Sequence, residues 1–197
     1  TKYEINSENM ILKRNDQILE SIYKTTIKDN NSNLFVLDEI NYHIENEILK
    51  GKNIIITTNY SKPKSDKYFF SSGIIDFKKD KIRAQDPRIT LHKNIFNNSE
   101  NDPRLFGVSS LKDGNLTTIE KGIFTSCKKS DSCPPWSIKA EKITHNQEKK
   151  QLNYKNAILQ VYDFPILYLP KFFHPDPSVK RQSGLLKPQI NNSNILG

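Results

Sequence analysis

The chain has 197 residues and carries 30 Lys and Arg side chains against 22 Asp and Glu, a formal net charge of +8. This length allows one domain, or one domain with a fragment of a second, and the positive charge favours anionic partners such as nucleic acid, a membrane surface or a phosphorylated glycan. With 35% hydrophobic residues and only 7 glycines, it is neither collagen-like nor a glycine-rich low-complexity chain. The most apolar run, 164–173, is broken by Pro165 and Pro170 and is too short to span a membrane as a helix.

Strand patterns dominate the sequence. Residues 11–22 show a helical period of apolar residues, but a weak one, whereas β-branched and aromatic residues fill 53–60, 67–77 and 157–162. Polar clusters of the kind found in turns separate these runs and recur about every ten to twenty residues. The sequence therefore predicts an all-β fold.

A faint internal repeat underlies these strands. The spacing of 13 positions between Ile40 and Asn53 recurs between Ile143 and Asn156, within segments that both predict strand, polar turn and strand. Residues 75–89 resemble a third copy. Short strand pairs at fixed spacing favour stacked β-layers, as in a jelly roll or a solenoid. The alternative is a generic β-sandwich whose spacing is coincidental.

Motifs of common catalytic and metal sites are missing. The 4 histidines are scattered, and Cys127 and Cys133 are spaced too widely for a compact zinc site. The sequence contains no Gly-rich phosphate loop and no G-x-S-x-G motif. We therefore expect no enzyme activity, no metal and no cofactor. The two cysteines fit one disulfide in an oxidising compartment and fit reduced thiols equally well.

Nucleic-acid binding is the other class that the charge suggests. Lysines gather at predicted turns such as Lys78-Lys79 and Lys149-Lys150. A single-strand binder interleaves basic residues with exposed aromatic residues on one sheet face, but the aromatic residues here lie in apolar strands and predict a core. Lysines that protect strand ends are the simpler interpretation, and we expect no nucleic-acid partner.

Several predicted strands are apolar on both faces. In 67–77, Phe69, Ile75 and Phe77 would share one face, and Tyr68, Phe70 and Ile74 the other. The pattern fits a sandwich core partly covered by loops, and it also fits an apolar groove between two sheet walls that holds acyl chains; alone, it favours the first. Alternation within the best strands predicts an interior formed by Ile54, Ile56, Phe69, Ile75, Phe77, Leu159 and Val161.

The last third of the chain carries unusual motifs in a fixed order. They are Gly122-Ile-Phe-Thr-Ser-Cys127, Cys133-Pro-Pro-Trp136, Tyr154-Lys-Asn-Ala157, Phe164-Pro-Ile-Leu-Tyr-Leu-Pro170 and the segment from Phe173-His-Pro-Asp-Pro to Pro188. Together they resemble the lipopolysaccharide-assembly family of the Gram-negative outer membrane (LptD, the organic-solvent-tolerance family). The resemblance is close from Cys127 to Pro188; residues 1–121 share only the repeated β-layers.

The resemblance implies a non-enzymatic lipopolysaccharide carrier. The implied fold is an open β-jelly roll of stacked short strand pairs, residues 1–175, whose apolar interior receives acyl chains. A linker and the first strand of a truncated outer-membrane β-barrel would follow, residues 176–197. The implied partners are lipopolysaccharide, a periplasmic bridge protein of the same fold that stacks by edge-strand addition, and a plug lipoprotein held by the barrel. The implied location is the outer membrane, with this portion facing the periplasm.

The sequence departs from this family by stopping at Gly197, where the barrel would begin. A stand-alone bridge protein of the same transport route and a basic nucleic-acid-binding β-module therefore remain as alternatives. The family ties its periplasmic domain to its barrel by disulfides; here a local Cys127–Cys133 bond and bonds to barrel cysteines are both open. Pro188 matches the first barrel strand, where a proline cannot donate to the strand ladder. The resemblance thus makes Pro188 a lateral-gate candidate, with a proline merely tolerated at a strand start as the alternative.

Overall fold

The structure is a computed structural model that describes residues 3–92, 102–128 and 135–175. These residues form one sheet of 15 strands. The first eight are β1 (Tyr3–Ser7), β2 (Ile11–Lys13), β3 (Ile18–Ser21), β4 (Thr25–Asp29), β5 (Leu34–His43), β6 (Ile48–Thr57), β7 (Lys67–Asp76) and β8 (Lys81–Gln85). The others are β9 (Arg88–Thr90), β10 (Arg104–Phe106), β11 (Ser109–Asp113), β12 (Leu116–Thr125), β13 (Trp136–Asn146), β14 (Gln151–Val161) and β15 (Phe164–Pro175).

The all-β prediction is confirmed. In the part of the chain that the structure describes, no helix is long and apolar enough to cross a membrane. The predicted linker and first barrel strand, 176–197, lie outside the described residues.

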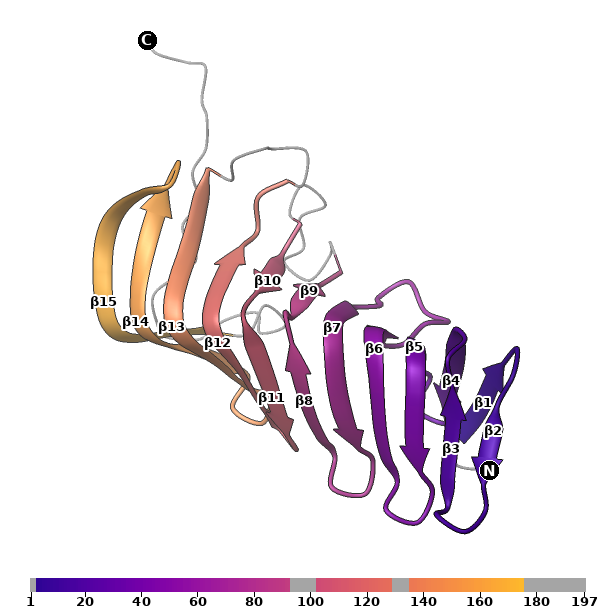
Figure 1. The fold of residues 1–197 in the computed structure, drawn as a ribbon. Coiled ribbons are helices and arrows are strands. Elements are labelled where there is room, and N and C mark those ends of the chain that lie inside the picture. The colour runs from indigo at the N-terminus through magenta and orange to yellow at the C-terminus, as the bar shows by residue number, and fades with distance from the viewer. Residues whose placement is uncertain (1–2, 93–101, 129–134, 176–197) are drawn as a thin grey trace.

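The strands follow one another across the sheet nearly in chain order. The central path is β1-β4-β5-β6-β7-β8-β11-β12-β13-β14-β15. The short strands complete the rows: β2 pairs with β3 beside β5, and β9 and β10 pair with each other between β7 and β12. Figure 1 shows the outcome, a row of strands with β1 and β2 at one end and β15 at the other.

Residues 11–22 form the β2–β3 hairpin and no helix. Polar residues 14–17 make the turn, where Gln17 has a φ of 53°. β3 then pairs with β5 from Ile18 opposite His43 to Ser21 opposite Ile40. A helix of about three turns is marginal in water by itself, whereas the neighbouring strand offers a full ladder of hydrogen bonds. Tertiary pairing therefore overrides the weak helical period.

A line of left-handed residues crosses the sheet and kinks it. Glu39 in β5, Asn53 in β6, Lys121 in β12 and Asn156 in β14 have φ values between 47° and 50°, and Asp86, between β8 and β9, has a φ of 49°. The alternation of side chains restarts at each kink. In β6, for example, the buried positions are the second and fourth residues before Asn53 and the first and third after it. Irregularities of this kind re-aim side chains and bend strands.

The kinks also explain the repeat in the sequence. Glu47, Asp80 and Lys150 close hairpin turns with φ values of 50–52°, and in each case a kink follows six positions later, at Asn53, Asp86 and Asn156. The 13-residue spacing found in the sequence thus begins in one strand of a hairpin, at Ile40 or Ile143, and ends at the kink of the next strand, at Asn53 or Asn156.

The kinks fold the sheet into two facing walls. Phe124 is in register with Leu167 of β15 through β13 and β14, and His174 lies seven positions beyond Leu167. In a flat sheet the rings of Phe124 and His174 would be more than about 20 Å apart, yet their centroids are 5.7 Å apart. Phe35 and Phe77 meet in the same way, with centroids 5.9 Å apart. The folded sheet is a jelly-roll-like β fold, as predicted.

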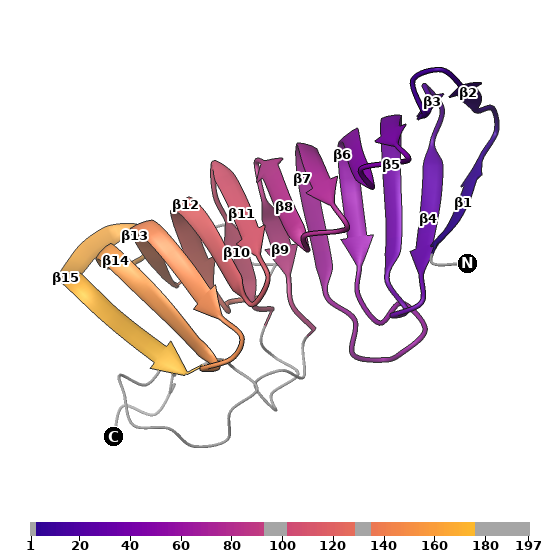
Figure 2. The ribbon, with the colours of Figure 1, turned by 90° about the horizontal axis from the view of Figure 1, so that it is seen from below.

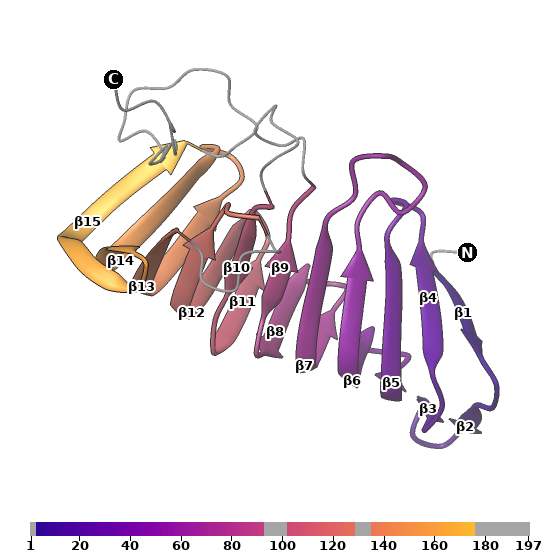
Figure 3. The same cartoon turned by 90° about the horizontal axis from the view of Figure 1, so that it is seen from above.

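We name the two walls by their residues. The first wall contains β2, β3, β8, β11 and residues 40–43, 48–52, 72–77, 116–120, 142–146, 151–155 and 171–175; the second contains β1, β4, β9, β10 and residues 34–37, 54–57, 67–70, 122–125, 136–140, 157–161 and 164–169. Figures 2 and 3 show β9 and β10 set apart from β8 and β11 by this folding.

Two clusters of buried side chains lie between the walls. The first extends over β4–β8 and includes Leu37, Leu49 and Ile54, each 0% exposed. The second extends over β9–β14 and is centred on Phe124 and Ile143. The side chain of Tyr68 packs against both clusters, so the apolar interior is continuous along the molecule.

Candidate binding groove

Beside the first cluster, the space between the walls opens into a groove of about 600 Å³. Its inner surface is apolar and includes Phe35, Ile56, Phe70, Ile75, Phe77 and Ile89, and its mouth is polar, with Asp80, Lys112 and Gln147. Cavities of roughly 300–1,000 Å³ with mostly apolar linings are typical ligand sites. The arrangement suits a ligand with an apolar body and a polar end.

Aromatic rings bound the groove on the side of β1. The ring of Phe77, which follows β7 on the first wall, lies 4.6 Å from the ring of Tyr3 and 5.9 Å from that of Phe35, both on the second wall. Tyr42 adds a third, edge-on contact at 6.4 Å. Burial raises the pKa of Tyr42, with smaller contributions from the nearby Glu47 and Tyr3. These rings span the two walls, so they close this end of the groove.

A second group of rings fills the space between the walls in β12–β15. Phe124 contacts Trp136 at 5.9 Å and His174 at 5.7 Å, and Tyr154 stacks on Phe172 at 4.5 Å. Phe124, Trp136, Tyr154 and His174 are all at most 6% exposed. The rings therefore form a solid end to the groove on the side of β15.

Tyr154 and His174 place polar atoms inside this ring cluster, and these atoms are hydrogen-bonded to each other. Tyr154 Oη lies 2.8 Å from His174 Nε2, and His174 Nδ1 lies 2.7 Å from the carbonyl oxygen of Pro175. Because that carbonyl can only accept, Nδ1 carries the proton and the Tyr154 hydroxyl donates to Nε2. Burial raises the pKa of Tyr154 far above its usual value.

Known proteins provide an independent comparison. No family model matches the chain. A segment of 88 residues, 42% of this chain, is 36% identical to the LPS-assembly protein LptD of Pseudoalteromonas translucida. LptD of Pseudomonas entomophila is 36% identical over 87 residues, 44% of the chain, and LptD of Legionella pneumophila (strain Lens) is 34% identical over 79 residues, 40% of the chain.

The chain is similar to the LPS-assembly protein LptD. The resemblance indicated by the motifs of the last third is therefore confirmed. The matched segments cover 11% of the Pseudoalteromonas protein, 8% of the Pseudomonas protein and 9% of the Legionella protein, so the match spans about a tenth of the length of these relatives.

The groove contains part of the interior that the sequence predicts for this LptD-like chain. Ile56, Ile75 and Phe77 line it, and Ile54 lies fully buried beside them. The predicted residues of β14 are elsewhere. Leu159 packs against the second cluster, and Val161 lies opposite Trp136. Whether these residues contact a lipid stays a prediction.

Phe69 does not face the interior, so that part of the prediction is wrong. The Arg88 guanidinium lies over its ring, 5.4 Å from the centroid, and Ile55, its partner in β6, is 39% exposed. Phe70, which is 4% exposed, points inward instead. The reason is that the β6–β7 ladder is interrupted at Ser71, which lies across from the left-handed residue Asn53. Alternation restarts there, so Phe69 is not on the face of Ile75 and Phe77.

Sequence reasoning missed Tyr3, Phe35 and Phe70 as lining residues. A signal for the third was present in the repeat itself. Asn53 and Asn156 occupy equivalent positions, and Asn is among the residues that tolerate the left-handed conformation. An asparagine recurring inside two predicted strands marks the point where inward and outward positions exchange.

The remaining predicted sites fall partly outside the described residues. Cys127 is a half-buried free thiol whose Sγ lies 3.6 Å from the carbonyl oxygen of Trp136. Cys133 and Pro188 lie outside the described residues, so the disulfide and the lateral gate stay predictions. Within residues 3–92, 102–128 and 135–175, no three His, Cys, Asp or Glu side chains are grouped as a metal site would require.

Proposed function

We propose that this chain binds the acyl chains of lipopolysaccharide in its groove and passes them to an outer-membrane barrel for insertion into the outer leaflet. The groove of about 600 Å³, apolar inside and polar at its mouth, carries the proposal. The similarity to the LPS-assembly protein LptD supports it. An amphiphile with several acyl chains needs such shielding in water, because each buried methylene contributes roughly 0.8 kcal/mol.

The polar mouth suits the sugar and phosphate end of the ligand. Lys112 points from β11 toward the mouth, in register with Ile82 of β8 and Thr117 of β12. Its ammonium group pairs with Asp80. A ligand whose acyl chains enter the groove would leave its head group beside these polar side chains and in contact with water. The role is non-enzymatic, since it needs binding and release but no bond making.

The proposed location is the outer membrane, with this portion facing the periplasm, and the proposed partners are a bridge protein, the barrel and its plug lipoprotein. The two end strands differ as docking edges. In β15, which pairs only with β14 among the described strands, Pro165, Pro170 and Pro175 lack the N–H that strand addition needs. β1 contains no proline. We therefore assign strand addition by the bridge protein to the edge formed by β1 and β2.

Photo-crosslinking tests the groove with adjacent residues of one strand. A benzophenone amino acid is placed at Phe70, which lines the groove, and in a separate variant at Phe69, which faces outward. Both variants keep an aromatic side chain, and both are expressed in cells that make lipopolysaccharide. We expect a lipopolysaccharide adduct from position 70 at several times the yield from position 69.

Equal yields from the two positions, or adducts with nucleic acid alone, would rule out lipid binding in the groove. A third variant at Ile56, on the neighbouring strand, guards against a local folding defect at position 70, because Ile56 lines the same groove. Thermal unfolding of all three variants confirms that each is folded before the yields are compared.

A further inference from the structure

Three lysines form a row on the outer surface of the first wall. Lys142 of β13 lies directly opposite Lys155 of β14, and Lys155 lies directly opposite Lys171 of β15. Across all described ladders these are the only pairs that place one basic residue opposite another. Elsewhere the partner is acidic, polar or apolar; Lys139, for example, faces Ile158. Like charges directly opposite destabilise a sheet, so the row carries a cost that the rest of the sheet avoids.

Acidic neighbours neutralise this lysine row only in part. Lys142 Nζ lies 3.4 Å from Glu120 Oε1, and Lys155 Nζ lies 3.5 Å from Glu141 Oε1. The Asn156 amide and the Lys155 ammonium hold the pKa of Glu141 below its usual value, and the two carboxylates together leave the three lysines with one unmatched positive charge. Lys171 forms no ion pair with any residue that the structure describes. The row therefore keeps a net positive charge.

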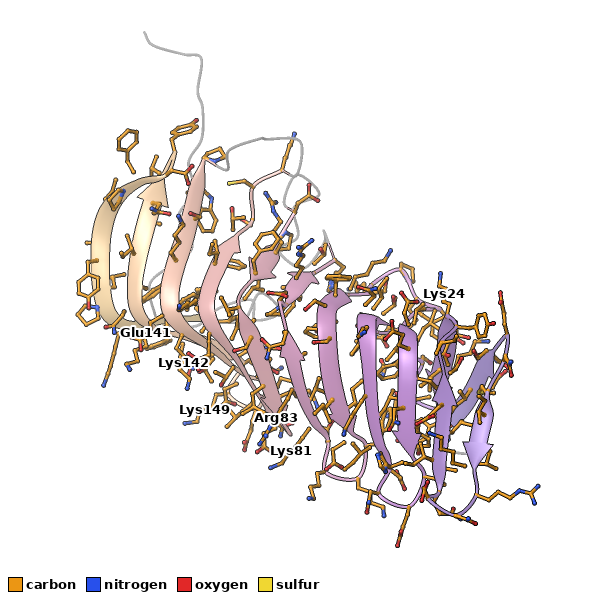
Figure 4. The ribbon with its side chains drawn as sticks, viewed as in Figure 1. Lys24, Lys81, Arg83, Glu141, Lys142 and Lys149 are labelled. Atoms are coloured by element: carbon orange, nitrogen blue, oxygen red, sulfur yellow. The ribbon has the colours of Figure 1, made fainter. Side chains whose placement is uncertain are left out.

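A hollow of about 320 Å³ coincides with the row. All three lysines line it, together with the polar side chains of Thr144 and Asn153 and the ring of Phe173, which is 39% exposed. Ile166 and Tyr168, 58% and 57% exposed, lie on the second-wall part of the same strand and do not line this hollow. Figure 4 shows Lys142 beside Glu141 toward the β15 end of the molecule, far from Lys24 at the other end.

We infer that Lys142, Lys155 and Lys171 bind the phosphate group of a lipid headgroup presented by a bilayer surface. Ammonium groups bind phosphate as point charges, and Thr144 and Asn153 add hydrogen-bonding groups. The exposed ring of Phe173, which lines the same hollow as the lysines, is of the kind that enters the interfacial layer of a membrane beside lysines that contact headgroups. The site lies on the outer surface, on the opposite face of the wall from the groove, so it goes beyond the proposed function and does not depend on it.

Vesicle flotation of the full chain tests this inference. Phosphatidylcholine vesicles are prepared with and without phosphatidylglycerol, at equal salt. We compare the variant Lys142→Gln/Lys155→Gln/Lys171→Gln with the control Lys24→Gln/Lys50→Gln/Lys67→Gln, which loses the same charge from exposed lysines elsewhere. For the first variant we expect partitioning onto phosphatidylglycerol vesicles to fall on the order of a hundredfold. For the control variant, partitioning onto the same vesicles should fall by less than about tenfold.

The stability of the same variants provides a second readout. Removing the opposed charges should leave the lysine-row variant at least as stable as the unmodified chain, because like-charge repulsion across β13–β15 is relieved. Retained folding together with lost vesicle binding supports the site. A lysine-row variant clearly less stable than the control would mean that these lysines serve the fold, and would overturn the inference.

Two further outcomes would also overturn it. If both triple variants lose vesicle binding equally, net charge and not the row is responsible. If inorganic phosphate, at the concentration of the lipid phosphate, displaces the chain from vesicles, the row takes free phosphate and the assignment to a bilayer headgroup is wrong. Failure of the crosslinks at Phe70 with vesicle binding intact would remove the proposed function alone.

Discussion

The groove region, β5–β11, and the ring-packed region, β12–β15, are built from the same folded sheet but filled differently. One row of inward positions on the first wall shows this difference. In register, it passes through Gly51, Gly73, Ala84 and Ser110 in the groove region and continues through Ile119, Ile143, Tyr154 and Phe172 in the ring-packed region. The side chains change from small to large along a single row.

The small residues let the opposite wall approach closely. A Cβ at Gly51 would lie 2.9 Å from Leu37 Cδ2, and one at Gly73 would lie 3.1 Å from Ile54 Cδ1. Leu37 and Ile54 of the second wall therefore pack directly against these glycines, next to the groove. In the ring-packed region, Tyr154 and the other rings fill the space up to His174. Of the four small residues in this row only Ser110 lines the groove, so the row marks where close packing of the two walls gives way to packing by large rings.

Truncating one ring in each region should give the largest contrast in stability. Phe124 is 1% exposed and touches rings on both sides, so Phe124→Ala should lower the free energy of unfolding by about 3–5 kcal/mol. Phe77 borders the groove, so Phe77→Ala should lose less than half of that and enlarge the groove. Urea denaturation followed by circular dichroism measures both. Equal losses would show that the two regions are packed alike.

The Tyr154–His174 hydrogen bond is specific to the ring-packed region. Tyr154→Phe removes the hydroxyl that donates to His174 Nε2 and should cost about 1–3 kcal/mol at neutral pH. The ring remains, so the loss reports the hydroxyl and not a cavity.

The same substitution should flatten the stability at high pH. Burial raises the pKa of Tyr154 in the folded chain, so unfolded chains lose this proton first as the pH rises. The corresponding stability is fully present below the ordinary tyrosine pKa near 10 and is lost above it, by up to about 1.4 kcal/mol per pH unit. The unfolding free energy of the original chain minus that of Tyr154→Phe should therefore shrink above about pH 10. A constant difference would mean that Tyr154 is not buried in the folded state.

The sequence predicts the strands, the repeat and the jelly-roll-like class, because these depend on local composition and spacing. It does not predict which face is inward beyond a kink. Alternation assumes an uninterrupted strand, and the kink between Phe70 and Ser72 made Phe69 the wrong choice. Asn53 and Asn156 could have marked the kinks of their strands, because asparagine tolerates the left-handed conformation. Lysine has no such preference, so the sequence does not indicate the kink at Lys121. The ring cluster was unpredictable for another reason, since its members meet only after the two walls face each other.

The kink at Lys121, where the ring-packed region begins, gives the smallest predicted effect. A left-handed conformation costs a non-glycine residue about 1–2 kcal/mol, and Lys121 adopts it with a φ of 49°. Glycine avoids that cost but loses more backbone entropy on folding, so Lys121→Gly should raise the free energy of unfolding by about 0.5–1 kcal/mol. Lys139 is the matched control on β13, since it lies in a regular part of the ladder opposite Ile123. Lys139→Gly should lower the free energy of unfolding by about 0.5–1 kcal/mol. Thermal and urea unfolding of the two variants should thus show opposite signs; a loss in both would mean that neighbouring strands impose the kink and that the residue at 121 does not govern it.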